Sequence, residues 1–189
     1  MGTPKTFCCL LYHLFYMSLQ VRTAGFDVFG LYRSAFPKEE RFPFLFLQMM
    51  KLRRSCRFLS YYKDGILAGL SFTVEGPEMV FVLYLAVSAN VRSRGYGSEI
   101  LSSLKDLYKK PLTLNIEPLD EDAANAEERK RRFSFYERNG FSNTGYLLQD
   151  SQMTYTVLST AEDFSVEDYT KALLGLHPFG MKMPEIFLQ

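Results

Sequence analysis

A segment with two glycines, residues 92–97 (Arg-Ser-Arg-Gly-Tyr-Gly), carries the clearest chemical signal in the sequence. It comes shortly after an apolar run, residues 79–88, that predicts a buried strand, and it precedes a stretch with helical periodicity. Glycine lets backbone N–H groups approach an anion closely, and a helix N-terminus adds positive potential. Arg92 and Arg94 add positive charge. The segment therefore predicts a binding site for a pyrophosphate group.

Other readings of this segment fit less well. A dinucleotide-binding loop has a third glycine where Ile100 stands, and it has an acidic residue at the end of the next strand, whereas Glu117 lies at the edge of a loop. A P-loop needs Gly-Lys-Ser/Thr, which this segment does not contain. A glycine pair that only begins a helix, without any ligand, stays open as an alternative.

Two patterns together resemble the GNAT superfamily of N-acetyltransferases. Arg92-x-x-Gly95-x-Gly97 after a strand is similar to that family's acetyl-CoA signature, Gln/Arg-x-x-Gly-x-Gly/Ala. Residues 135–141 (Phe-Tyr-Glu-Arg-Asn-Gly-Phe) resemble its second signature, Phe-Tyr-x-x-x-Gly-Phe. The resemblance covers roughly residues 17–160. Two departures are Ala89, where the family often has proline, and Arg129, where many members carry a cofactor-contacting asparagine.

The resemblance implies a role for each matching position. The end of the apolar strand offers backbone hydrogen bonds to the pantetheine arm, the glycine segment holds the pyrophosphate, and Tyr136 lies near the thioester sulfur. The cofactor-binding residues that it implies are Leu85, Ala86, Val87, Arg92, Ser93, Arg94, Gly95, Tyr96, Gly97 and Ser98.

The expected chemistry follows from the charges that acetyl transfer creates. The departing thiolate needs a proton, which the phenol of Tyr136 can supply, and the oxyanion needs a donor such as the Val87 N–H. The attacking amine must lose a proton, and Glu117 is our candidate base, directly or through water. Two plainer alternatives stay open: Tyr136 as a packing residue, and Glu117 as a solvated carboxylate in an acidic loop.

Aromatic and acidic residues suggest an acceptor site. Phe36, Phe42, Phe44 and Tyr146 predict apolar walls, while Glu39, Glu40 and the acidic stretch after Glu117 attract a cation. This combination favours an amine, such as a polyamine, an aminoglycoside, an amino acid or a peptide N-terminus. Core packing explains the phenylalanines equally well.

The leading hypothesis is therefore an enzyme that moves an acetyl group from acetyl-CoA to a primary amine of a small molecule or peptide, by direct attack in a ternary complex. The alternative is a catalytically silent domain that binds or senses acyl-CoA. A nicotinamide-dependent oxidoreductase is a weaker third hypothesis because of the glycine spacing.

The predicted elements form an α/β domain. Strands are expected at residues 18–22, 57–62, 66–75, 79–88, 112–116, 146–149 and 153–159. Helices are expected at about 28–35, 43–52, 95–109 and 166–176, with a further one that carries Glu127 to Arg132 and ends at Asn139-Gly140. The order along the chain is β-α-α-β-β-β-α-β-α-β-β-α. This order matches a GNAT-like mixed, mostly antiparallel sheet of about seven strands with helices on both faces. We predict one such domain, residues 17–189, after an N-terminal extension, residues 1–16.

Composition limits the partners. The formal net charge is only +1, which argues against nucleic acid or an anionic membrane, and the apolar run at residues 7–17 is too short to span a bilayer. That run also fits a signal peptide or a myristoylation pattern weakly. Three cysteines, Cys8, Cys9 and Cys56, are too few for a disulfide framework and lack a zinc-site spacing, so we expect no metal and a cytoplasmic location. A homodimer stays open.

Overall fold

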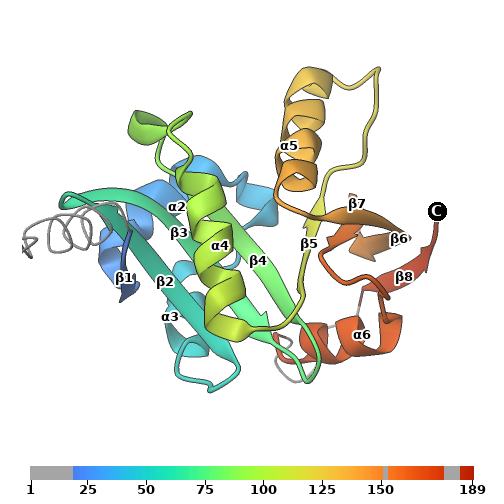
Figure 1. The fold of residues 1–189 in the computed structure, drawn as a ribbon, viewed down its shortest axis with the longest axis horizontal. Coiled ribbons are helices and arrows are strands. Elements are labelled where there is room, and N and C mark those ends of the chain that lie inside the picture. The colour runs from blue at the N-terminus through green and yellow to red at the C-terminus, as the bar shows by residue number, and fades with distance from the viewer. Residues whose placement is uncertain (1–18, 151–152, 177–183) are drawn as a thin grey trace, which may run out of the picture.

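The computed structural model describes residues 19–150, 153–176 and 184–189. Within these residues, eight strands form one sheet in the order β1-β2-β3-β4-β5-β7-β6-β8 (Figure 1). All neighbours are antiparallel except β4 and β5. The strands are β1 (Gln20–Thr23), β2 (Cys56–Lys63), β3 (Ile66–Glu75), β4 (Val80–Val87), β5 (Leu112–Ile116), β6 (Ser142–Asp150), β7 (Met153–Ser159) and β8 (Glu185–Leu188). The predicted mixed, mostly antiparallel sheet is confirmed, with one strand more than the seven expected.

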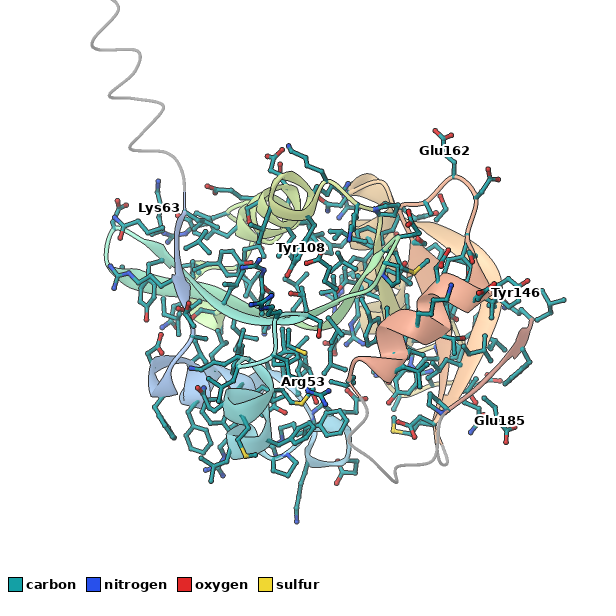
Figure 2. All side chains as sticks on the ribbon, turned by 90° about the horizontal axis from the view of Figure 1, so that it is seen from below. Arg53, Lys63, Tyr108, Tyr146, Glu162 and Glu185 are labelled. Atoms are coloured by element: carbon teal, nitrogen blue, oxygen red, sulfur yellow. The ribbon has the colours of Figure 1, made fainter. Side chains whose placement is uncertain are left out.

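Helices cover both faces of the sheet, as predicted. They are α2 (Phe29–Ala35), α3 (Phe44–Met50), α4 (Tyr96–Tyr108), α5 (Ala126–Arg138) and α6 (Val166–Leu174), with short 3-10 helices η1 (Phe26–Val28), η2 (Lys38–Glu40) and η3 (Ala89–Val91). Figure 2, turned by 90° from Figure 1, shows α4 on one side of the sheet and α2 and α3 on the other. Each face has its own buried core, one around Tyr32, Leu47 and Tyr169, the other around Leu104 and Tyr136.

Strands β4 and β5 separate soon after they begin. Their parallel pairing consists of Val80 with Leu112 and Phe81 with Thr113. Beyond these pairs β4 continues to Val87 beside β3, while β5 runs beside β7 to Ile116. The two strands therefore diverge toward their C-terminal ends, and among the described residues no strand pairs with that edge of β4 there.

The structure differs from the predicted elements mainly at the C-terminal side of the sheet. β6 begins at Ser142, four residues before the predicted Tyr146, because a bulge between Asn143 and Leu147 interrupts the pattern. Gly145 adopts a left-handed φ of 77° in this bulge. β8, which pairs with β6, was not predicted. The proposed extension, residues 1–16, lies outside the described residues, and none of the helices that the structure describes is long and apolar enough to cross a membrane.

Candidate functional site

The predicted pyrophosphate segment forms the turn that begins α4. Gly95 has a φ of 82° and Ser93 a φ of 62°, so the chain passes through the left-handed region twice before the helix starts at Tyr96. The N–H groups of residues 95–98 donate no hydrogen bond to any residue that the structure describes. These groups are the free donors of a 13-residue helix, and they are suited to bind an anion.

Gly97 lies where the two sequence signatures meet. A Cβ placed on Gly97 would lie 2.9 Å from Cζ of Phe135 on α5 and 3.5 Å from Cγ2 of Val87 on β4. Phe135 begins the second signature, residues 135–141. The fold thus brings both signatures and the end of β4 into contact, and only a residue without a side chain fits between them.

The free edge of β4 presents backbone groups of the predicted cofactor strand. The N–H of Ser88 donates to the carbonyl of Ala68 on β3, at 2.9 Å. Successive residues of a strand direct their N–H groups to opposite edges, so the N–H of Val87 points away from β3, toward the gap between β4 and β5. Leu85 has the same orientation as Val87. Leu85 and Val87 therefore offer backbone donors and acceptors that no strand of the described residues uses, whereas Ala86 between them is turned toward β3.

Tyr136 places a buried hydroxyl beside this edge of the sheet. The residue is 9% exposed, and its ring packs on Phe135 and Phe141, with centroids 5.1 and 5.5 Å away. Its hydroxyl makes no hydrogen bond with a described residue. Burial raises the pKa of Tyr136 to about 12, against a lowering effect of Arg132. Buried hydroxyls usually have a hydrogen-bond partner, so this hydroxyl is available to a group that enters the site.

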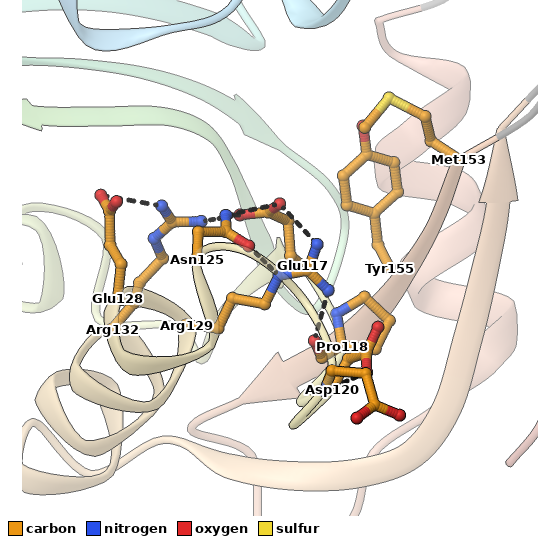
Figure 3. A network of polar contacts seen from close by, with 10 residues as sticks. Glu117, Pro118, Asp120, Asn125, Glu128, Arg129, Arg132, Met153 and Tyr155 are labelled. Atoms are coloured by element: carbon orange, nitrogen blue, oxygen red, sulfur yellow. Dashed lines mark hydrogen bonds and ion pairs between the residues drawn. The ribbon is translucent and has the colours of Figure 1, made fainter.

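Glu117 follows β5 and is held by three side chains (Figure 3). Its Oε2 lies 2.7 Å from Nη1 of Arg132, its Oε1 lies 3.1 Å from Nη2 of Arg129, and Nδ2 of Asn125 donates to both oxygens at 3.3 and 3.4 Å. Burial raises the pKa of this carboxyl, but the hydrogen bonds of Arg132 and Asn125 and the two positive charges outweigh it and hold the pKa below its usual range. Glu117 is therefore an ionised carboxylate inside a formed network.

Arg129, which stands in place of the family's asparagine, belongs to the same network. It also donates from Nε to Asn125 at 2.8 Å and from Nη1 to the carbonyl of Pro118 at 3.0 Å. With these partners its guanidinium fixes the loop after β5.

Two buried tyrosine hydroxyls hold the loop that carries Glu40. Tyr84 on β4 donates to the carbonyl of Glu40 at 2.7 Å and accepts from the N–H of Phe42 at 3.0 Å. Tyr32 on α2 donates to the carbonyl of Phe42 at 2.9 Å. The loop is therefore fixed to the middle of β4, next to Leu85.

The aromatic residues predicted for the acceptor site lie in three different places. Phe44 is 8% exposed and packs against Tyr32 and Phe58, so it is a core residue. Phe36 and Phe42 are partly buried beside the loop, and Phe36 packs on Tyr84 at 4.7 Å. Tyr146 packs on Phe164, at 5.7 Å.

Three residues of this region were missing from the predicted site: Tyr84, Arg132 and Tyr155. Tyr84 had a signal, because it carries the one polar side chain in β4, Val80–Val87. Arg132 and Tyr155 become neighbours of Glu117 only through the pairing of β5 with β7 and the packing of α5. Among the described residues no group of three His, Cys, Asp or Glu side chains is arranged to hold a metal ion, and Cys56 is a buried free thiol.

Comparisons with known proteins agree with this geometry. The Acetyltransferase (GNAT) family profile matches residues 26–141. YjbC of Bacillus subtilis (strain 168), described by its name as a "putative acetyltransferase", is 36% identical over 83 residues, which span 44% of this chain and 41% of that relative. The matched part is thus less than half of YjbC.

Solved structures share the fold. A GNAT-family protein of Bacteroides thetaiotaomicron has a TM-score of 0.64 at 21% identity, over 79% of this chain and 91% of the other. The PaiA N-acetyltransferase of Thermoplasma acidophilum, solved in complex with coenzyme A, has a TM-score of 0.55 at 16% identity, over 76% and 98% of the two chains. Since the family profile covers more than half of the sequence and includes both signatures, this chain belongs to the GNAT family of acetyltransferases.

Proposed function

We propose that this chain transfers an acetyl group from acetyl-CoA to a primary amine of a small molecule or peptide, by direct attack in a ternary complex. The observation that carries the proposal is the convergence at the end of β4. There the N–H groups of residues 95–98 and the strand edge at Leu85 and Val87 have no backbone hydrogen bond to a described residue. Helix α5, which carries Tyr136, comes close to the same place because Phe135 lies against Gly97. We also propose that residues 17–189 form one catalytic domain.

The residues present fit coenzyme A. In this proposal the turn before α4, with Arg92, Arg94 and Ser98, binds the pyrophosphate, and Ser93, Gly95, Tyr96 and Gly97 shape it. Leu85, Ala86 and Val87 provide the strand edge for the pantetheine arm, with Leu85 and Val87 offering the free backbone groups. Acetyl-CoA itself supplies an acyl group activated as a thioester.

Three groups of the chain would then assist the reaction. The Val87 N–H, which points into the gap beside β4, stabilises the oxyanion. Tyr136 gives its proton to the departing sulfur, and its raised pKa keeps the phenol protonated at neutral pH. Glu117 is our sequence-based candidate for the base. Arg129, Arg132 and Asn125, however, already bind the two carboxylate oxygens of Glu117, one of which would have to accept the proton.

Two measurements test the proposed function. Thermal unfolding with acetyl-CoA, coenzyme A and NAD separates acyl-CoA binding from nicotinamide binding, because a ligand at 100 times its Kd adds about 2.7 kcal/mol to the free energy of unfolding. Thiol release from acetyl-CoA with a panel of polyamines, aminoglycosides, amino acids and peptides then tests turnover. Stabilisation by acetyl-CoA without thiol release for any amine would favour the silent acyl-CoA-binding domain.

A further inference from the structure

We propose that Glu40 is a catalytic residue of the acetyl transfer and that its carboxylate accepts the proton of the acceptor ammonium. Glu117, in this proposal, positions the loop after β5 and does not take the proton. The inference rests on the proposed function and adds to it the identity of the base and the charge of the acceptor.

The position of Glu40 is fixed by its backbone. Its carbonyl accepts from Tyr84 at 2.7 Å, and two residues further on Phe42 is bound from both sides, by Tyr84 and by Tyr32. Tyr84 is 4% exposed and lies on β4 directly before Leu85, the first residue of the predicted cofactor strand. The loop with Glu40 is thus attached to the same strand that forms the coenzyme A side of the site.

The carboxylate of Glu40 lies within electrostatic range of groups across the gap between β4 and β5. Its carboxylate interacts electrostatically with Glu117, which follows β5, and with Arg132 on α5, and it acts on the phenol of Tyr155 on β7. The remaining charged or titratable groups around it are Glu39 and Arg41 of its own loop and the phenol of Tyr84. Glu40 therefore lies on the wall opposite Glu117.

The carboxylates of Glu117 and Glu40 differ in the hydrogen bonds and ion pairs that they already make. Glu117 receives hydrogen bonds or ion pairs from Arg129, Arg132 and Asn125. Glu40, which is partly buried, accepts none from a side chain that the structure describes. An oxygen without a donor is free to accept a proton from a bound ammonium, whereas removing a donor from Glu117 costs the network a buried hydrogen bond.

The titration of the two groups points the same way. Burial, and then the negative charge of Glu117, raise the pKa of Glu40, while the network lowers the pKa of Glu117. A proton acceptor works best when its pKa approaches the working pH, so Glu40 is the stronger base of the pair. The charge of Glu117 thereby makes its neighbour more basic.

The protons and electron pairs balance as follows. Glu40 takes one proton from the ammonium, and the lone pair set free on nitrogen forms the C–N bond. The C–S bond breaks with its electron pair on sulfur, which takes the proton of Tyr136. The second proton that nitrogen loses restores the phenol, and Glu40 releases its proton to solvent. The sum is an ammonium and an acetyl thioester giving an amide, a thiol and one proton.

Glu40→Gln tests this role, with Glu78→Gln as the matched control, because Glu78 is an exposed carboxylate in the turn between β3 and β4 and has no part in the proposed site. The measurement is kcat/KM for the best amine of the panel between pH 6 and about pH 10, near the pKa of a free alkyl ammonium. For Glu40→Gln we expect a loss of about 10²–10⁴-fold at neutral pH. That loss should shrink toward high pH, where the amine arrives already neutral. Glu78→Gln should follow the wild-type profile throughout.

Several outcomes overturn the proposal. A loss that is the same at every pH would assign Glu40 a structural role, and no loss beyond that of Glu78→Gln would assign it none. If Glu117→Gln loses kcat/KM in a pH-dependent way and Glu40→Gln does not, then Glu117 is the base. Unchanged stabilisation of Glu40→Gln by acetyl-CoA shows that the fold and cofactor site are intact. If the wild-type protein binds acetyl-CoA but acetylates no amine, the proposed function fails together with this inference.

Discussion

The hydroxyl of Tyr84 lies between two backbone groups of one loop, donating to the carbonyl of Glu40 at 2.7 Å and accepting from the N–H of Phe42 at 3.0 Å. Tyr84 is buried in β4, whereas the loop belongs to the segment between α2 and α3. A single phenol thus sets the distance between the strand that we assign to coenzyme A and the carboxylate that we assign to the amine.

Tyr84→Phe should loosen this loop. The substitution keeps the ring in the core but leaves one carbonyl and one N–H without their partner, which costs about 1–3 kcal/mol. We expect a lower Tm and a lower kcat/KM for the amine, with the stabilisation by acetyl-CoA unchanged. Tyr146→Phe is the control for stability, since the Tyr146 hydroxyl makes no hydrogen bond with a described residue. Equal Tm values for the two variants would show that the Tyr84 contacts do not stabilise the fold.

The turn before α4 allows a comparison of two left-handed glycines. Gly95 and Gly65 have φ values of 82° and 79°, and a Cβ on either would have no atom within 4 Å. Valine at either position adopts a strained backbone, at about 1–2 kcal/mol. We expect Gly95→Val and Gly65→Val to lower stability alike, but only Gly95→Val to abolish binding of acetyl-CoA, measured by thermal shift. Binding that survives in folded Gly95→Val contradicts the assignment of the pyrophosphate site.

Gly97→Val acts by a different mechanism. Its Cβ would approach Phe135 to 2.9 Å, and the branched side chain adds further overlap, so α4, α5 and β4 must move apart. Loss of acetyl-CoA binding is expected here as well, accompanied by a lower Tm. Phe135→Leu in the same chain should recover part of that Tm, and its failure to do so would mean that the predicted overlap is not the cause.

The ion pairs of Glu117 make stability depend on pH. Its pKa is lowered on folding, so its stabilising contribution is complete above the unfolded value, near 4.5, and is lost as the pH falls through the folded pKa. Glu117→Gln leaves Arg129 and Arg132 without their carboxylate, at about 1–3 kcal/mol. We expect the gap in free energy of unfolding between wild type and variant to be constant from pH 5 to 8 and to narrow below about pH 4.5.

Glu128→Gln is the control for this measurement. Glu128 is 64% exposed and lies 3.5 Å from Arg132, and such surface pairs contribute between about 0 and 1 kcal/mol. If both variants lose the same stability, the Glu117 network is only a surface feature.

The sequence predicted much of this molecule because its signals are local. Asp64-Gly65 marks a hairpin, Pro111 precedes β5, and Gly140 follows α5 with a φ of 81°. The strand β8 was missed because its four residues have no turn signal and pair only with the bulged strand β6. Its place depends on the sheet, which no local pattern encodes.

The candidate site likewise contains residues that local patterns predicted and relationships that they could not predict. The glycine segment and Tyr136 are local signatures, and Gly97 with Phe135 shows them in contact. The difference between Glu40 and Glu117 was not predictable, because it depends on Arg132 reaching across from α5 and on Tyr84 binding a loop more than 40 positions earlier. The sequence gives the sign of the charge on each side chain, whereas tertiary packing decides which groups that charge contacts.

Tyr136→Phe tests the proposed acid. Phenylalanine keeps the packing on Phe135 and Phe141, and no hydrogen bond to a described residue is lost, so Tm and acetyl-CoA affinity should stay close to wild type. General-acid assistance is worth about 10²–10⁴-fold in rate. With a pKa near 12 the phenol is a weak acid for a thiolate whose pKa is about 8.5, so we expect the lower end of that range. The loss should appear in kcat, because the proton is needed only as the thiolate departs.

The pH profile gives a second test of the acid. In the wild type, kcat should stay constant until the pH nears 12, where the phenol loses its proton, and should then fall. Tyr136→Phe should lack this fall. The control is Tyr62→Phe on β2, a partly buried tyrosine whose hydroxyl donates to Asp27; this variant should keep full turnover. If Tyr136→Phe also keeps full turnover with the best amine, the acid role is wrong and Tyr136 only packs.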